Sequence, residues 1–171
     1  MKKVHLFILS ISLLALDTSV QAQQCEITEV LVALNGKINI RFPIVDSLHP
    51  FALKGLTEYQ KDFGLSKQEA SEIEKHSKKS AGKKLDSSFI NGSRLIPSQA
   101  FYKAYQNGDS LSLSFIEKNK PFYTLSVPLF FNDGQKVVLD IDLIGREGYT
   151  YLLVKRQGKW VIQKEFVRWI V

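Results

Sequence analysis

The sequence contains only one cysteine, Cys25, so no internal disulfide bond can stabilise the fold. An exported domain built from this chain would depend on its hydrophobic core instead. A lipoprotein carries a small residue directly before its modified cysteine, and Gln24 occupies that position here, which argues against lipidation. We expect Cys25 to lie in a loose N-terminal segment, with dimerisation through its thiol as the alternative.

Long apolar runs are equally scarce. The run Leu6–Leu16 is too short to span a bilayer, and no later segment reaches the roughly 18 apolar residues of a transmembrane helix. Two lysines precede this run and Val20 and Ala22 follow it, which is the pattern of a secretory signal peptide. We therefore predict a signal peptide over residues 1–22, a single domain over residues 23–171, and a periplasmic or extracellular location.

The sequence also lacks Gly-x-Ser-x-Gly, His-Glu-x-x-His and phosphate-loop motifs. His49 lies in a predicted loop near Asp46, and His76 lies among the lysines of a predicted helix, where we expect it to be solvated. One aspartate and one histidine are too few for a metal site, which normally uses three or four ligands. We therefore expect no metal and no cofactor, and the sequence offers no positive sign of an enzyme.

The charge balance is basic. The predicted signal peptide contains Lys2, Lys3 and Asp17, so its removal lowers the formal net charge from +6 to +5. A basic protein favours anionic partners such as lipid head groups, phosphorylated glycans or acidic proteins. An exported protein rarely meets nucleic acid, so we do not expect that partner.

The densest group of lysines is Lys75, Lys78, Lys79, Lys83 and Lys84. One interpretation is the solvated end of a helix. The alternative is a patch that binds an anionic membrane or glycan surface.

Residues 65–84 form the clearest helical segment. Ser66 and Glu69 match a Ser-x-x-Glu capping box, acidic residues fill the early turns and lysines the last, and Gly82 is placed to end the helix. Its apolar stripe is thin and consists of Leu65, Ala70 and Ile73. We therefore expect a surface helix that is attached by one narrow edge.

The segment before this helix is ambiguous. Asn35-Gly36 separates two apolar runs and is a preferred type I′ hairpin pair, but it can also cap a short helix over residues 26–34. We predict the hairpin and keep the helix as the alternative. Residues 46–64 indicate a loop with one short helix near Leu53–Phe63.

From Phe89 onward the pattern changes to strands. The expected strands are residues 110–115, 122–131, 135–144, 149–156 and 159–170. Their close spacing and the turns between them predict an antiparallel meander, in which Pro128 marks a sheet edge or a bulge. The predicted fold is therefore α+β: an N-terminal hairpin or short helix, one or two helices, then a C-terminal antiparallel meander of four to six strands.

The last predicted strand is apolar at both parities. Trp160, Ile162, Phe166 and Ile170 share one parity, and Val161, Val167 and Trp169 share the other. A strand that is apolar on both faces is usually central or covered on both sides. We therefore expect this strand to be tied into the sheet.

Five residues on these strands are candidates for a pocket. Asp140 and Asp142 are two residues apart, so they share a face of their strand, and paired carboxylates can do acid–base chemistry when burial separates their pKa values. The alternative is a solvated strand face. Tyr149, Tyr151 and Trp160 either line a ligand pocket on the curved sheet or belong to the core.

Several short motifs follow one another in residues 65–171. They are Lys83–Asp86, Ser126–Phe130, Asp133-Gly134, Tyr149–Tyr151, Lys155–Trp160 and Trp169-Ile170. In this order they resemble a group of small, uncharacterised secreted proteins of Gram-negative bacteria, and the C-terminal half is similar to cone-shaped α+β domains of the nuclear transport factor 2 type. The resemblance implies an exported α+β domain and no established activity. Many members carry a cysteine and a glycine-rich loop before the tyrosine strand, whereas this chain has Leu143–Gly148 there without a cysteine.

Three functions follow as hypotheses. The leading one is a non-catalytic binding domain of the cell envelope with a protein partner, as an inhibitor or immunity-type protein would be. The first alternative is a small-ligand or catalytic pocket on the sheet, and the second is binding of an anionic surface through the lysine-rich helix.

Overall fold

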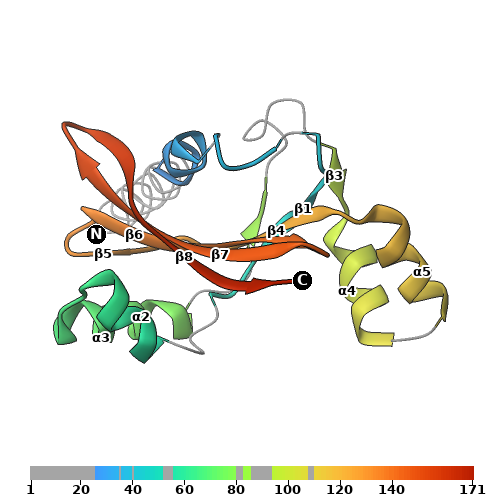
Figure 1. Cartoon of the computed structure of the whole chain (residues 1–171), viewed down its shortest axis with the longest axis horizontal. Helices are drawn as coiled ribbons and strands as arrows, with labels where there is room; N and C mark the ends of the chain where they lie inside the picture. The colour runs from blue at the N-terminus through green and yellow to red at the C-terminus, as the bar shows by residue number, and fades with distance from the viewer. Residues whose placement is uncertain are drawn as a thin grey trace, which may run out of the picture.

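A computed structural model of the chain describes residues 26–34, 36–39, 41–51, 56–79, 83–85, 94–107 and 110–171. Within these ranges, eight strands form one mixed sheet in the order β2-β1-β4-β6-β7-β8, with β3 paired to β1 and β5 paired to β6. Helices lie on both sides of the sheet (Figure 1). The predicted α+β class is confirmed, and the predicted signal peptide and Cys25 lie outside the described residues.

A helix over residues 26–33 comes first in the described chain. The elements that follow it are β1 (Ile44–His49), α2 (Leu56–Phe63), α3 (Lys67–Lys79), β2 (Lys83–Lys84), β3 (Leu95–Ile96), α4 (Ser98–Asn107), α5 (Ser110–Asn119), β4 (Phe122–Ser126), β5 (Leu129–Phe131), β6 (Lys136–Ile144), β7 (Glu147–Arg156) and β8 (Lys159–Ile170). Strand β1 runs parallel to β3 and β4, whereas β4, β6, β7 and β8 pair antiparallel in succession.

Helix α3 has the predicted N-terminus. The Glu69 amide donates to Ser66 Oγ at 3.2 Å, and the Ser66 amide donates to the Glu69 carboxylate at 2.8 Å, which is a complete capping box. Ile73 is fully buried on the attached edge of the helix. The prediction that His76 is solvated is wrong, because its Nδ1 lies 2.7 Å from the carbonyl oxygen of Phe130. Gly82, the predicted helix stop, lies outside the described residues.

Two predicted strand segments are helices. The N-terminal hairpin is wrong and the alternative is correct, since the helix over residues 26–33 buries Val30 and Leu31 in the core. The strand over residues 110–115 is also wrong, because this segment belongs to α5. A strict alternation of six residues is too short to exclude a helix, and here packing decides, with Ile116 of α5 placed against the buried Phe122.

The turns expected between the C-terminal strands are confirmed. Residues Asn132, Asp133 and Gly134 all have positive φ between β5 and β6. Gln157 and Gly158, with φ of 51° and 76°, form the tight turn between β7 and β8. The predicted strand over residues 122–131 is interrupted before Leu129, and its two parts, β4 and β5, pair with different stretches of β6. Pro128 therefore lies at a break in the strand, as its lack of an N–H requires.

Strand β8 is an edge strand, and the expectation that it is central or covered on both sides is wrong. Val167 and Ile170 are 45% and 71% exposed. Alternate residues of β8 do not stay on one face along its whole length, because the pairing with β7 shifts register twice. Trp160 and Phe166 share sequence parity, but the shift between them sends Trp160 to one core cluster and Phe166 to another.

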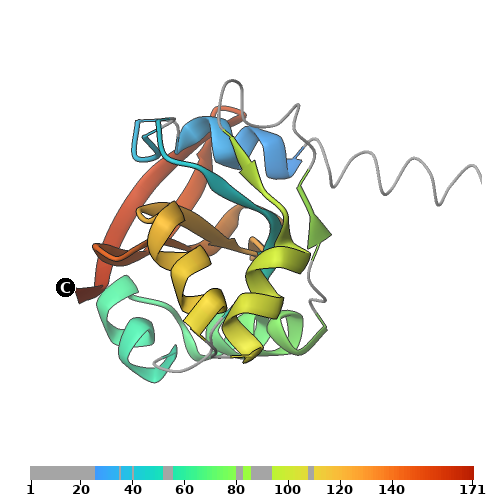
Figure 2. The same cartoon turned by 90° about the vertical axis from the view of Figure 1, so that its right-hand side faces the viewer.

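The two faces of the sheet are covered differently. The helix over residues 26–33 packs on one face, against a core that includes Leu139, Tyr151 and Trp160. We call the other side, which carries Asp140 and Asp142, the aspartate face. Helices α2 and α3 cover one end of it and α4 and α5 the other, as the two views show (Figures 1 and 2).

Candidate functional site

A strip of polar side chains crosses the aspartate face between the two helix pairs. Its members are Ser47, His49, Thr124, Ser126, Asp140, Asp142, Thr150 and Arg168, and we call them the polar strip. Apolar clusters flank it on both sides, under α2 and α3 at one end and under α4 and α5 at the other. A polar strip enclosed between apolar clusters is unusual, because buried polar groups destabilise the folded state unless they are hydrogen-bonded or ion-paired.

Asp140 lies at the centre of the polar strip. Its side chain is fully buried, and Thr150, its cross-strand partner on β7, donates a hydrogen bond of 2.6 Å to Oδ1. On the other side, the Asp140 amide donates to Ser126 Oγ at 2.8 Å. The second carboxylate oxygen, Oδ2, is buried and has no hydrogen-bond partner among the described residues.

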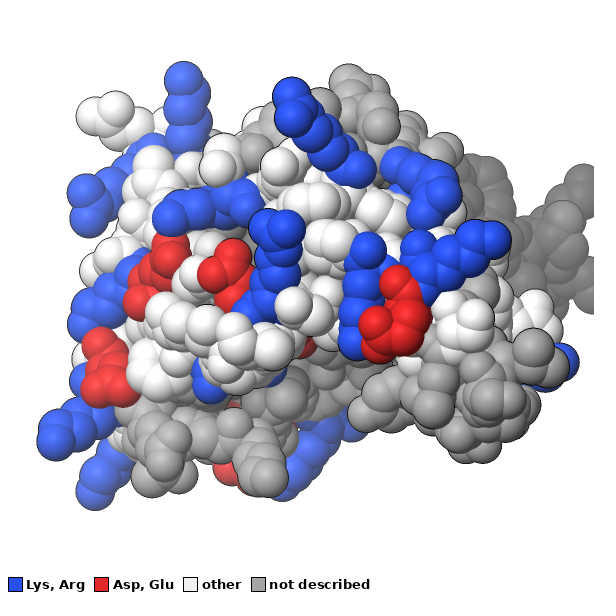
Figure 3. Space-filling view, turned by 45° about the vertical axis from the view of Figure 1, so that its right-hand side comes forward, with Lys and Arg blue, Asp and Glu red and all other residues white. Residues whose placement is uncertain are grey.

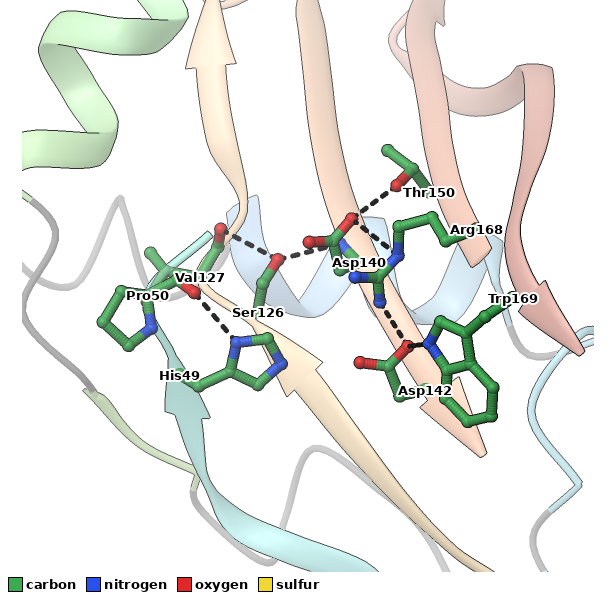
Figure 4. A network of polar contacts seen from close by, with 9 residues as sticks. All are labelled: His49, Pro50, Ser126, Val127, Asp140, Asp142, Thr150, Arg168 and Trp169. Atoms are coloured by element: carbon green, nitrogen blue, oxygen red, sulfur yellow. Dashed lines mark hydrogen bonds and ion pairs between the residues drawn. The ribbon is translucent and has the colours of Figure 1, made fainter. Parts of the chain in front are cut away.

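The edge strand β8 contributes the counter-charge. Arg168 contacts the carboxylate of Asp142, and its Nε lies 3.5 Å from Asp140 Oδ1 (Figure 4). The neighbouring Trp169 donates its indole N–H to Asp142 at 3.2 Å. Consecutive residues of a regular strand point to opposite faces, but the register shift after Val167 directs both Arg168 and Trp169 to the aspartate face.

Burial controls the electrostatics of Asp140. Removal from water raises the pKa of Asp140 to about 6. The charge of Arg168 and the hydrogen bond from Thr150 act in the opposite direction and lower this pKa. Two smaller effects follow: the charge of Asp142 raises the pKa, and His49 lowers it. This carboxyl group can therefore exchange a proton in the range where many binding and acid–base functions work.

His49 ends β1, and Ser126 of β4 lies between it and Asp140 (Figure 4). Its Nδ1 lies 2.9 Å from the carbonyl oxygen of Pro50. A carbonyl oxygen can only accept, so Nδ1 carries a proton, and in the neutral form of the ring Nε2 is an acceptor. The ring extends toward the strands that carry Ser126 and the two aspartates (Figure 4).

A pocket of about 280 Å³ lies at the His49 end of the polar strip. The residues that line it are Val45, Ser47, His49, Phe101, Tyr102, Thr124 and Ile144. It is thus formed by β1, β4 and β6 below and by α4 above. Ser47 Oγ is buried here without a hydrogen-bond partner among the described residues. The pocket therefore combines apolar walls with polar atoms that are free to meet a ligand.

Comparisons with protein-family models, with curated proteins and with solved structures find no match for this chain. The resemblance to nuclear transport factor 2-type domains and to small secreted proteins therefore stays a prediction.

The five residues predicted as pocket candidates do not lie together. Asp140 and Asp142 belong to the polar strip, whereas Tyr149, Tyr151 and Trp160 lie on the opposite face. There the two tyrosine rings are 5.9 Å apart, and Tyr149 donates to Glu147 at 2.6 Å. That hydrogen bond raises the pKa of Tyr149 to about 12, and burial raises the pKa of Tyr151.

The third aromatic residue of that group is Trp160. Its ring centroid is 5.8 Å from that of Phe130, and Lys155 Nζ lies 5.3 Å from the ring centroid. An apolar groove of about 450 Å³ runs between Trp160 and Val32 of the first helix. The aromatic residues therefore serve mainly as core on this face.

The predicted lysine patch is only partly described. Lys75, Lys78 and Lys84 are exposed, and the side chains of Lys79 and Lys83 lie outside the described part. Lys78 is paired with Glu74 at 2.7 Å. On the face shown in Figure 3, basic side chains are spread widely, with acidic ones beside several of them.

A wider depression of about 660 Å³ runs along α3 and the turn after β5. Two of its acidic side chains already have partners: Glu69 binds Lys136 at 2.6 Å, and Glu72 accepts from the Asn132 amide at 3.1 Å. Because these contacts use its polar atoms, the depression is a weaker candidate than the pocket beside His49.

Neither a metal site nor a membrane-spanning helix is found among the described residues. No group of three or more His, Cys, Asp or Glu is arranged there to hold a metal ion. None of the helices in that part of the chain combines the length and the hydropathy that crossing a bilayer requires.

Sequence reasoning missed His49, Thr150, Arg168 and Trp169 as members of this site. Of these, only the Arg168-Trp169 pair carried a signal, since a charged residue beside a tryptophan interrupts an otherwise apolar strand end. The other two need the strand pairing to be recognised.

Proposed function

We propose that this protein binds a small ligand in the pocket beside His49, with Ser47, His49 and Thr124 of the polar strip as its polar wall. The single observation that carries this proposal is the buried Ser47 Oγ, which lines this pocket and has no hydrogen-bond partner among the described residues. A buried acceptor without a donor costs about 1–3 kcal/mol, a cost that a ligand or a bound water can remove. His49, whose Nε2 is not used by the Pro50 contact, lines the same pocket, and the unpartnered Oδ2 of Asp140 adds a second unsatisfied acceptor at the centre of the polar strip.

The test is a fragment screen by NMR on the isotope-labelled protein. Small fragments that bind the pocket should shift the amides of Val45, Thr124 and Ile144, which line it. His49→Gln should weaken this binding. His76→Gln is the matched control, because His76 makes the same type of Nδ1 contact to a backbone carbonyl but belongs to α3. Absence of any fragment that shifts the pocket amides would reject the proposal.

A protein partner is a second proposal, and strand β8 is the observation that favours it. The strand is an edge, and it exposes Val161, Val167 and Ile170. A long edge strand with apolar side chains can pair with a strand from another protein. Crosslinking in envelope extract should capture a partner with the wild-type protein, and Val167→Lys should abolish this capture. If Val167→Lys captures the partner as well as wild type does, β8 is not the contact.

Export is likewise proposed from the sequence. Intact mass of the protein from its own cells should correspond to a chain that begins at Gln23. A chain that retains residues 1–22 would contradict this proposal.

A further inference from the structure

We infer that the ligand of the pocket beside His49 carries an amine, bound as its ammonium form, on a small apolar body. This inference rests on the proposed function above and adds the chemical class of the ligand. It follows from the hydrogen-bond roles, the charges and the walls of the site.

The free polar atoms at this end of the polar strip are mainly acceptors. The Nδ1 proton of His49 is used by the Pro50 carbonyl, so Nε2 offers a lone pair in the neutral form of the ring. Asp140 does not line the pocket, but its unpartnered oxygen, on the far side of Ser126 from His49, is a further acceptor in the polar strip. Ser47 Oγ can take either role. A ligand that fits this set must bring N–H or O–H donors.

The charges favour a cation over an anion. The polar strip holds two carboxylates, Asp140 and Asp142, and the single guanidinium of Arg168 already contacts both. The described residues that line the pocket include no lysine or arginine. An anionic ligand would therefore meet no lysine or arginine here, whereas an ammonium group would lie near a strip whose two carboxylates share one guanidinium.

The walls fit an apolar body of limited size. Val45 and Ile144 form the floor, and Phe101 and Tyr102 of α4, with ring centroids 5.5 Å apart, form the upper wall. Aromatic rings next to a cation add a further attraction. A volume of about 280 Å³ is below the range of typical drug-sized sites, so one ring with a short amine arm is a suitable size.

The test compares three probes of nearly the same shape on the wild-type protein: benzylamine, benzyl alcohol and benzoate. We expect benzylamine to shift the amides of Val45, Thr124 and Ile144. It should bind about tenfold more tightly than benzyl alcohol, and benzoate should bind more weakly than either. The benzylamine affinity should fall as salt rises, because part of it is electrostatic. This comparison needs no variant and so does not depend on how a mutant folds.

Two variants refine the result. Asp140→Asn should weaken benzylamine several-fold while it leaves benzyl alcohol unchanged, and the exposed Asp133→Asn should change neither. If benzyl alcohol or benzoate binds the pocket as tightly as benzylamine, the amine class is wrong while the proposed pocket stands. If other fragments bind there and none of these three does, the amine class fails alone; if no fragment binds, the proposed function fails with it.

Discussion

The indole of Trp169 lies directly across Gly148, in the space where a β-carbon would stand. A Cβ built on Gly148 would collide with the indole Nε1 and with Asp142 Oδ1. The glycine is thus what lets Trp169 reach across β7 and donate to Asp142 on β6. Three adjacent strands are joined by one side-chain contact that passes over the middle one.

Gly148→Ala should therefore destabilise the protein. The added methyl group must displace either the indole or the carboxylate, and overpacking of this kind costs about 1–3 kcal/mol. Gly36→Ala is the matched control, because a Cβ there meets nothing within 4 Å, and it should change stability by less than about 0.5 kcal/mol. Urea unfolding of the two variants measures the difference, and equal stabilities would contradict the contact.

Arg168→Met tests the counter-charge of the polar strip. The substitution leaves the buried Asp140 and the partly buried Asp142 without their cation, which should cost about 3 kcal/mol. Lys159→Met, at the exposed start of β8, should cost less than about 0.5 kcal/mol. Adding Asp142→Asn to Arg168→Met should recover part of the loss, because it removes one unpaired charge. A double variant no more stable than the single one would argue against this coupling.

The register of one hairpin decided which predicted site residues meet. A two-residue turn between β6 and β7 would pair Ile144 with Glu147 and place Asp140 opposite Tyr151, on the same face. The actual pairing is Leu143 with Glu147, so Asp140 lies opposite Thr150. A shift of one residue moves every side chain to the other face. The sequence therefore predicted correctly that the two aspartates share a face, but the prediction that Tyr149, Tyr151 and Trp160 share that face with them was wrong.

Local signals predicted local structure well. The capping box at Ser66 and the turn at Gln157-Gly158 each depend on a few neighbouring residues, and each is present. Pro128, where an edge or a bulge was predicted, interrupts the strand between β4 and β5. Features that depend on distant segments were not predictable. The register shift that brings Arg168 to Asp142, and the packing that makes residues 110–119 a helix, are set by tertiary contacts.

The pH dependence of stability should reveal Asp140. Because burial raises the pKa of Asp140 to about 6 from an ordinary 3.8, the folded protein holds this proton more tightly than the unfolded chain. The contribution to stability is therefore full below about pH 4 and is lost as the pH rises through about 6. In Asp140→Asn this dependence is absent.

Between pH 4 and pH 7.5, wild type should therefore lose about 3 kcal/mol of its free energy of unfolding relative to Asp140→Asn. Asp133→Asn, on the exposed turn after β5, is the control and should show no such change. Parallel stability profiles for wild type and Asp140→Asn would mean that the carboxyl group titrates alike in the folded and unfolded states.

The capping box offers a prediction that does not depend on the site. Ser66→Ala removes the oxygen that accepts from the Glu69 amide, and loss of such a cap costs about 1 kcal/mol. Ser71→Ala, at an exposed position inside α3, should be neutral or slightly stabilising because alanine is the better helix former. Since α3 packs beside β5, away from the pocket beside His49, Ser66→Ala should leave binding at that pocket unchanged. Stability from urea unfolding and fragment binding by NMR check both statements, and a loss of binding at unchanged stability would contradict the separation of the two regions.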